Sequence, residues 1–175
     1  MKTSEIPTAR LRPAAAVDLP AINAVIEGAV MTWELPERVK RLVLPSYRYS
    51  RHDLDHLHLV VAEAPDGGIA GVAAWETADQ RDVPAGKTGL LLHGLYVDPE
   101  QQRRGVGTLL LDAAVSAARE QGVDGLLVKA QPDAVDFFVA RGLTRLAVED
   151  PDRDYAHRYW LAATGTTRRH MAPGT

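Results

Sequence analysis

The segment with the clearest chemistry is a basic glycine loop, Gln102-Arg103-Arg104-Gly105-Val106-Gly107, which stands between an apolar run at 90–97 and a helical pattern. In a glycine-containing loop that opens a helix, several backbone N–H groups converge on one point, and the positive end of the helix dipole points there too. Glycine also allows a close approach to a ligand and a positive φ. The loop therefore indicates a site for a phosphate or a pyrophosphate.

Two common phosphate-binding loops fit these residues poorly. A Walker loop requires Gly-Lys followed by Ser or Thr, and these residues are not found here. A dinucleotide-binding fingerprint requires a third glycine three residues after the second, where this chain has Leu110. That fingerprint also usually lies in the first βα unit of its domain, whereas this loop lies past the midpoint of the chain.

The periodicity of apolar residues predicts the elements that position the loop. Strands are expected at 8–14, 57–63, 69–76, 90–97, 126–130, 143–148 and 157–162. Helices are expected at 19–30, from the loop to Gly122 and at 132–141, with an uneven helical segment from Pro36 to about Asp53. Asp18 is expected to cap the first helix, and Asp-Gly at 66–67 predicts a tight hairpin turn.

Length and composition limit the class of protein. The chain has 175 residues, 46% of them hydrophobic, which predicts a single domain over residues 1–163, followed by a disordered tail at 164–175. The absence of cysteine excludes disulfides, thiolate metal sites and an acyl-cysteine intermediate, and we expect no metal. A net charge of −3 gives no support to nucleic-acid binding. Because there is no apolar run suited to a membrane span or a secretory signal, we expect a cytoplasmic protein.

The surroundings of the loop carry a family resemblance. Strand residues Leu95-Tyr96-Val97 and an Asp98-Pro99 turn precede the loop, and a helix followed by Gly142-Leu143 lies downstream. This pattern resembles the GCN5-related N-acetyltransferase (GNAT) superfamily, and the element order over residues 8–163 is similar too. The resemblance implies an α/β (α+β), acyl-CoA N-acyltransferase-like fold, with a mixed central sheet of about six to seven strands and about four flanking helices.

The same resemblance implies that the ligand is an acyl-coenzyme A, with acetyl-CoA as acetyl donor. In the family the loop amides, here 103–108, hold the pyrophosphate, and the strand before the loop pairs with the pantetheine arm, here at Leu95 and Val97. One of the two loop arginines is expected to contact phosphate, the alternative for each being a solvated surface side chain. The implied coenzyme A contacts are Leu95, Tyr96, Val97, Gln102, Arg103, Arg104, Gly105, Val106, Gly107, Thr108, Gln131 and Phe138.

His93 is the candidate catalytic base. Acetyl transfer needs a base because a lysine-like amine, with a pKa of about 10.4, is protonated at neutral pH. Strand alternation places Leu91, His93, Leu95 and Val97 on one side unless a bulge intervenes. Some relatives carry a carboxylate where this chain has Leu91, whereas others, the aralkylamine transferases, resemble it in having His-x-Leu-x-Val. Imidazole titrates near neutral pH and can accept a proton; the alternative is a core histidine bound by a neighbour.

Phe138 departs from the family pattern. Relatives commonly have a Phe-Tyr pair before Gly-Phe, and their tyrosine protonates the departing sulfur, whereas this chain has Phe137-Phe138 before Gly142-Leu143. Phe138 has no proton to give and is expected to pack against the cofactor. Activity can survive this loss, because a thiol with a pKa of about 8.5 is already a tolerable leaving group.

The acceptor site in the family is built from the segment between the first two helices, the loop after the hairpin and the last strand pair. Here the candidates are Trp33, Glu34, Trp75 and Tyr155, of which the tryptophans could equally be core or interface residues. Aromatic side chains beside carboxylates suit a cationic or aromatic amine.

We therefore expect an N-acetyltransferase acting on a primary amine of a small molecule or a peptide, without nucleic-acid or membrane partners. The alternative is a weakly active or non-catalytic acyl-CoA-binding regulatory module. Homodimers are common among relatives, but the sequence identifies no interface.

Overall fold

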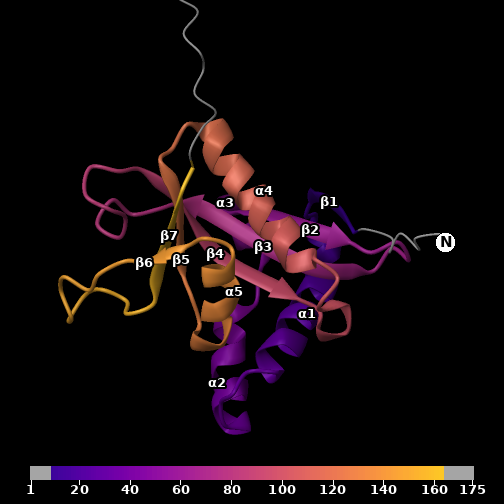
Figure 1. The fold of residues 1–175 in the computed structure, drawn as a ribbon. Coiled ribbons are helices and arrows are strands. Elements are labelled where there is room, and N and C mark those ends of the chain that lie inside the picture. The colour runs from indigo at the N-terminus through magenta and orange to yellow at the C-terminus, as the bar shows by residue number, and fades with distance from the viewer. Residues whose placement is uncertain (1–8, 164–175) are drawn as a thin grey trace, which may run out of the picture.

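A mixed seven-stranded sheet forms the centre of the computed structural model, which describes residues 9–163 (Figure 1). The strand order is β1-β2-β3-β4-β5-β7-β6, and only β4 and β5 run parallel. The strands are β1 (Arg10–Pro13), β2 (His58–Glu63), β3 (Ile69–Thr77), β4 (Gly89–Val97), β5 (Gly125–Lys129), β6 (Thr144–Arg145) and β7 (Arg158–Ala162). The predicted mixed sheet is confirmed, and the predicted tail at 164–175 lies outside the described residues.

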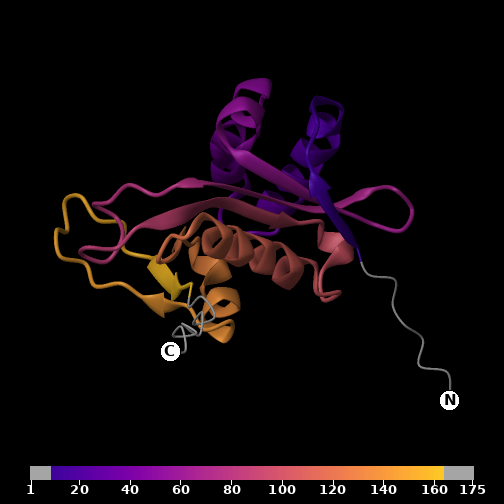
Figure 2. The ribbon, with the colours of Figure 1, turned by 90° about the horizontal axis from the view of Figure 1, so that it is seen from above.

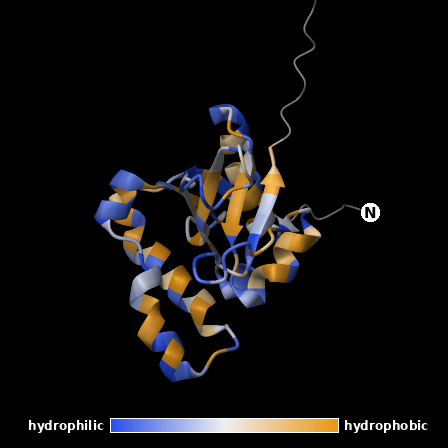
Figure 3. Cartoon of the chain, turned by 90° about the vertical axis from the view of Figure 1, so that its left-hand side faces the viewer, coloured by the Kyte–Doolittle hydropathy of each residue, from blue (hydrophilic) through white to orange (hydrophobic). Residues whose placement is uncertain are grey.

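Helices cover both faces of the sheet. They are α1 (Leu19–Met31), α2 (Glu37–Tyr47), α3 (Arg51–His56), α4 (Val106–Gln121) and α5 (Val135–Ala140), with short 3-10 turns η1 (Ala16–Asp18), η2 (Pro99–Gln101) and η3 (Pro132–Ala134). Figure 2 shows α1 and α2 on one face and α4 and α5 on the other. In Figure 3 hydrophobic residues dominate the central strands, whereas the helices carry hydrophobic and hydrophilic patches. This is the pattern of helices that bury one side on a sheet.

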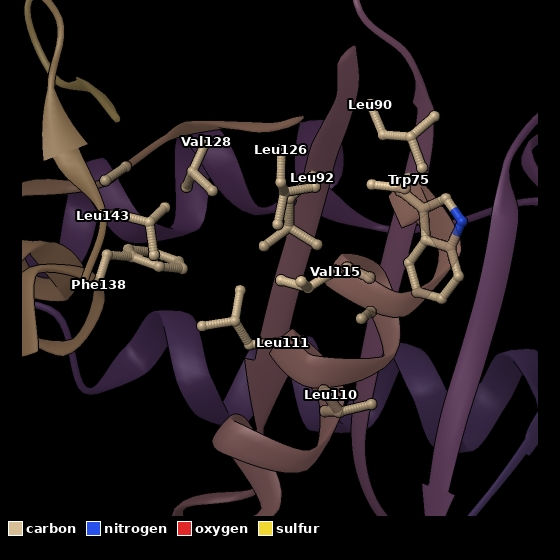
Figure 4. Packing of buried hydrophobic residues seen from close by; sticks show 14 of the residues in the cluster. Trp75, Leu90, Leu92, Leu110, Leu111, Val115, Leu126, Val128, Phe138 and Leu143 are labelled. Atoms are coloured by element: carbon tan, nitrogen blue, oxygen red, sulfur yellow. The ribbon is translucent and has the colours of Figure 1, made fainter. Parts of the chain in front are cut away.

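The main core lies between α4 and the sheet (Figure 4). Leu110, Leu111 and Val115 recur at helical spacing and are at most 7% exposed, as expected for a helix with one buried face. They pack against residues of β4 and β5, including Leu92 and Leu126. The helix ends at Gly122, whose left-handed φ of 71° closes it as predicted. A second core on the opposite face joins α1 to β2 and β3.

Some local predictions were wrong. Asp18 does not cap α1 with its side chain; its carboxylate instead accepts hydrogen bonds from Arg12 and from the amide of Ala15. The uneven segment contains a separate helix, α3, which begins in a capping box formed by Ser50 and Asp53. The strand predicted at 143–148 is only two residues long.

A buried carboxylate explains why β6 is short. The Asp154 carboxylate accepts hydrogen bonds from the amides of Glu149 and Asp150, each at 3.1 Å, and holds the chain in a loop between β6 and β7. It also lies 3.3 Å from the buried Arg158 guanidinium. The amide of Asp150, followed by other donors, lowers the pKa of Asp154 below its ordinary value, although burial acts in the opposite direction.

A bulge in strand β4 determines which way the side chains near the site face. Ala74 of β3 pairs with Gly94 and Trp75 pairs with Leu92, so His93 is an extra residue that forms a bulge. The side-chain alternation reverses there: Leu95 joins the α4 core, whereas Leu91 packs in a separate cluster with Leu127. The predicted grouping of residues 91, 93, 95 and 97 on one side applied only to a strand without a bulge, and the bulge at His93 breaks it.

Candidate active site

A cleft of about 990 Å³ opens where β4 and β5 diverge. The described pairing of β4 with β5 ends at Leu92 and Val128, whereas β4 continues along β3 to Val97. The main chain of residues 93–97 is therefore left with a free edge toward β5. The cleft is lined by residues 92–97 of β4, by the glycine loop except Arg104, by residues 128–134 and 136–138, and by residues 32–34 after α1. Sheet, loop and helix ends thus meet at one concave surface.

The glycine loop presents a row of amides to this cleft. Gly105 is the N-cap of α4 with φ 76° and ψ 10°, and Arg103 also has a positive φ of 65°. Among residues 9–163, no hydrogen-bond acceptor is found for the amide N–H groups of 102–108. Such alternating left-handed residues gather N–H groups into a concave anion-binding nest, and the helix N-terminus adds its dipole. The positive φ that glycine allows is thus adopted at Gly105, the first glycine of the loop.

The two loop arginines lie differently. Arg103 lines the cleft, whereas Arg104 is outside its lining and its guanidinium lies 3.3 Å from the side-chain oxygen of Gln101. The other loop residues predicted to bind coenzyme A, Gln102, Gly105, Val106, Gly107 and Thr108, all line the cleft. Arg103 is therefore the loop arginine that is placed to meet an anion.

Helix α5 forms the wall opposite β4. Phe138 is 5% exposed and belongs to both the core and the cleft lining. A Cβ added at Gly107 would lie 3.1 Å from the Phe137 ring, so the small residue lets α4 and α5 come together. Arg141 lies 3.8 Å above the Phe137 ring and donates a 2.8 Å hydrogen bond to the Thr108 hydroxyl. Arg141 thus brings a second guanidinium to the loop end of the cleft.

His93 lies on the cleft at the β4 bulge. Its side chain is exposed, and its Nδ1 lies 3.3 Å from the hydroxyl of Tyr49, which is only 5% exposed. Burial raises the pKa of Tyr49 far above its ordinary value, with smaller contributions from Tyr96 and nearby carboxylates. Tyr49 is therefore a neutral phenol at neutral pH. Within residues 9–163, Nδ1 of His93 is engaged by Tyr49 and Nε2 has no hydrogen-bond partner.

The remaining end of the cleft is aromatic and acidic. Trp33 and Tyr47 meet edge to face with ring centroids 5.3 Å apart, and Tyr47 meets Tyr96 at 6.5 Å. The Gln131 side-chain amide donates a 3.0 Å hydrogen bond to the Tyr47 hydroxyl. Carboxylates are close by at Glu34 and Asp133, and the Asp133 carboxylate accepts a 2.9 Å hydrogen bond from the Glu34 amide.

Comparison with known proteins identifies the family. A model described as the Acetyltransferase (GNAT) family matches residues 28–143, which include the loop, β4 and α5. The chain belongs to the GNAT acetyltransferase family. It is accordingly an acyltransferase, as the sequence predicted. No protein in a curated set matches the chain.

Solved GNAT structures share the fold. The PaiA N-acetyltransferase of Thermoplasma acidophilum, solved with coenzyme A, is 16% identical, with 87% of this chain and 97% of that chain covered at a TM-score of 0.65. YhbS of Escherichia coli, also with CoA, is 18% identical, with 93% and 86% covered and a TM-score of 0.64. A Brucella melitensis GNAT acetyltransferase with acetyl-CoA is 20% identical, with 90% and 99% covered and a TM-score of 0.58. At these identities the similarity supports the GNAT fold.

Two predicted acceptor residues of this GNAT chain are outside the cleft lining. Trp75 is 6% exposed and packs in the core around α4, because the β3 register points it toward that helix. The Tyr155 hydroxyl donates a 2.9 Å hydrogen bond to the carbonyl of Ala130, which lines the cleft, but Tyr155 itself is exposed and outside the lining. The other predicted residues, Trp33, Glu34, His93, Leu95, Tyr96, Val97, Gln131 and Phe138, all line it.

Sequence reasoning missed other residues of the site. Tyr47 and Tyr49 come from the uneven segment around Pro45, where no periodicity indicated which side chains face inward. Arg141 was overlooked although it directly precedes Gly142. Its position one turn after Phe137, at a helix end, could have indicated that it lies beside the loop.

Across the described part of the chain, no helix is long and apolar enough to span a membrane.

Proposed function

We propose that this GNAT protein is an N-acetyltransferase that transfers the acetyl group of acetyl-CoA directly to a primary amine of a small molecule or a peptide. One observation carries the proposal: the glycine loop with its unpaired amides, the free edge of β4 and His93 all line a single cleft. The loop amides therefore suit an anionic group, the edge of β4 suits an extended arm that contains amides, and the region around His93 suits an acyl group.

The residues present fit acetyl-CoA. The loop amides, with Arg103 and Arg141 beside them, offer donors and positive charge for a pyrophosphate. The free edge of β4 at residues 93–97 offers main-chain partners for the two amides of a pantetheine arm, as a peptide does when it adds to a sheet edge. A volume of about 990 Å³ suits a long ligand with one end outside the cleft.

In the proposed reaction His93 accepts a proton, whereas Phe138 can supply none. Acetyl-CoA supplies an activated thioester, the amine nitrogen bonds to its acetyl carbon, and the carbon–sulfur bond breaks. An amine that arrives as an ammonium loses one proton to Nε2 of His93, the ring nitrogen not engaged by Tyr49, before it attacks. The second N–H proton leaves to water as the amide forms. Phe138 stands beside this site without a proton to give, so the departing thiolate takes its proton from water.

The aromatic and acidic end of the cleft supports a cationic acceptor. Trp33 and Tyr47 offer ring faces and edges, and Glu34 and Asp133 offer negative charge. A protonated amine is attracted both to aromatic faces and to carboxylates. The acceptor class proposed here is therefore an amine that arrives charged and is deprotonated at His93.

Phe138 also supports a second candidate, an acyl-CoA-binding module with little or no turnover, because the usual proton donor is missing. The two candidates agree on acetyl-CoA binding and differ on turnover. Calorimetric titration with acetyl-CoA tests the binding that they share, and the absence of binding would eliminate both.

A panel of primary amines with a free-thiol readout separates the two candidates. The N-acetyltransferase predicts thiol release that depends on the amine, is lost in Gly105→Asp through weaker acetyl-CoA binding, and is reduced in His93→Ala at unchanged acetyl-CoA affinity. Tight acetyl-CoA binding with no amine-dependent release on any member of the panel would favour the module.

A further inference from the structure

Asn23 of α1 fixes the main chain of Tyr49, which is 26 positions away. The Asn23 side-chain oxygen accepts a 2.9 Å hydrogen bond from the Tyr49 amide, and its side-chain nitrogen donates a 3.0 Å hydrogen bond to the Tyr49 carbonyl. Asn23 lies on a helix whose neighbouring side chains Ile22 and Ile26 are fully buried. Tyr49, in the link between α2 and α3, is therefore held by a rigid element.

The Tyr49 side chain is fixed as well. Its ring is buried in the core beneath α1, and its hydroxyl reaches the β4 bulge beside Gly94. A Cβ at Gly94 would clash with that hydroxyl and with the ring of Tyr96, so the glycine makes room for the approach. Among the described residues, His93 Nδ1 is the partner that this hydroxyl reaches.

Building on the proposed function, we propose that Tyr49 is a positioning residue for His93: its hydroxyl binds Nδ1 and leaves Nε2 as the nitrogen that takes the proton of the amine. The chain of contacts runs from Asn23 through Tyr49 to His93. The bulge makes this contact possible, because it turns His93 away from the regular alternation of β4 and toward Tyr49.

The proposed role requires one of the two possible directions of the Tyr49–His93 hydrogen bond, which depends on the tautomer of His93. A neutral imidazole carries one hydrogen, so Nε2 can accept a proton only when Nδ1 holds that hydrogen. Nδ1–H then donates to the Tyr49 oxygen, which has lone pairs available as a neutral phenol. After proton transfer, Nδ1–H still donates to the same oxygen, so the contact serves both states of the ring without rearrangement.

Nuclear magnetic resonance of the ligand-free protein tests the hydrogen bond independently of activity. Nitrogen-15 shifts of imidazole distinguish Nδ1–H from Nε2–H, and among the six histidines the signal of His93 is the one lost in His93→Gln. The proposal predicts the Nδ1–H form in the wild type and a mixture in Tyr49→Phe, which removes only the hydroxyl. Identical shifts in the two proteins, or an Nε2–H form in the wild type, would overturn it.

A double-mutant cycle tests the catalytic consequence. Losing one hydrogen bond of this kind is worth about a five- to tenfold loss in kcat. Tyr49→Phe should show that loss with an unchanged KM for acetyl-CoA, and no further loss when added to His93→Ala. Tyr159→Phe is the matched control, since Tyr159 is also 5% exposed but lies outside the cleft lining, and it should leave kcat unchanged.

The outcomes separate the positioning role from the proposed function. Equal losses from Tyr49→Phe in both backgrounds would indicate a general structural effect and overturn the proposal. No amine-dependent turnover in the wild type would instead count against the proposed function. In that case the imidazole shifts still decide whether Tyr49 sets the proton position of His93.

Discussion

Replacing Gly105 with alanine tests the glycine loop where its backbone is most constrained. Gly105 has φ +76°, a left-handed value that costs an L-residue roughly 1–2 kcal/mol. Among the described residues nothing lies within 4 Å of the added Cβ, so no clash adds to that cost. Gly105→Ala should lower the free energy of unfolding by about 1–2 kcal/mol, which corresponds to a Tm about 2–8 °C lower for a chain of this size.

Gly86 provides a matched control for this substitution. It has φ +75°, its added Cβ also meets nothing within 4 Å in the described structure, and it lies outside the cleft lining. Gly86→Ala should therefore show a similar fall in Tm. The two variants differ in that Gly105 lies at the N-terminus of α4 beside unpaired amides and the cleft, whereas Gly86 lies in a loop outside the cleft lining.

The two variants should diverge in acetyl-CoA affinity, measured by calorimetry. If alanine leaves the left-handed region, the amides of residues 103–107 no longer converge, and losing one charge-assisted hydrogen bond costs about 1.5–3 kcal/mol. Gly105→Ala should thus weaken acetyl-CoA binding by roughly 10- to 100-fold, whereas Gly86→Ala should not change it. A folded Gly105→Ala protein with wild-type affinity, or equal weakening in both variants, would refute the assignment of the loop.

Three further predictions concern the loop arginines, the cleft wall and the β6–β7 loop. Arg103→Ala should weaken acetyl-CoA binding more than Arg104→Ala in calorimetric titrations, because only Arg103 lines the cleft; the reverse order would contradict the placement. Phe138→Tyr should raise kcat by about tenfold or more in the thiol-release assay by supplying the missing proton donor, and an unchanged or lower kcat would argue against that role. Asp154→Asn leaves the buried Arg158 without its anion and should unfold at a lower denaturant concentration than the wild type at neutral pH, and an unchanged midpoint would contradict this role. Because the folded pKa of Asp154 lies below its ordinary 3.8, the stabilisation is complete above that value and is lost as pH falls through the folded pKa, so the wild type should lose its advantage over Asp154→Asn in acid.

The loop and its supporting elements could be predicted because their signals are local. Gly105, Gly107 and the apolar spacing of Leu110, Leu111 and Val115 specify a turn with a positive φ and a helix with one buried face. These properties depend on neighbours within one or two helical turns. The hairpin, the helix after the loop and the predicted strands other than that at 143–148 accordingly agree with the structure.

The catalytic surroundings could not be predicted in the same way. The bulge at His93 depends on how β4 pairs with β3, and a slip of one residue reverses every following side chain. Tyr49 reaches His93 over 44 positions, and Asn23 reaches Tyr49 over 26. These contacts follow from tertiary packing, for which sequence spacing carries no signal. For the same reason the prediction of Trp75 as an acceptor-site residue was wrong, because this side chain packs in the core.

Direct detection of the acetylated amine by mass spectrometry tests the central claim, that this cleft transfers acetyl groups to amines. The wild-type protein, acetyl-CoA and each amine of a panel would be incubated, and acetylated product would be counted against released thiol. The proposed function predicts one acetylated amine per thiol for at least one member of the panel, with both falling together in His93→Ala. Thiol release without acetylated amine, or full acetyl-CoA binding with neither product, would contradict it.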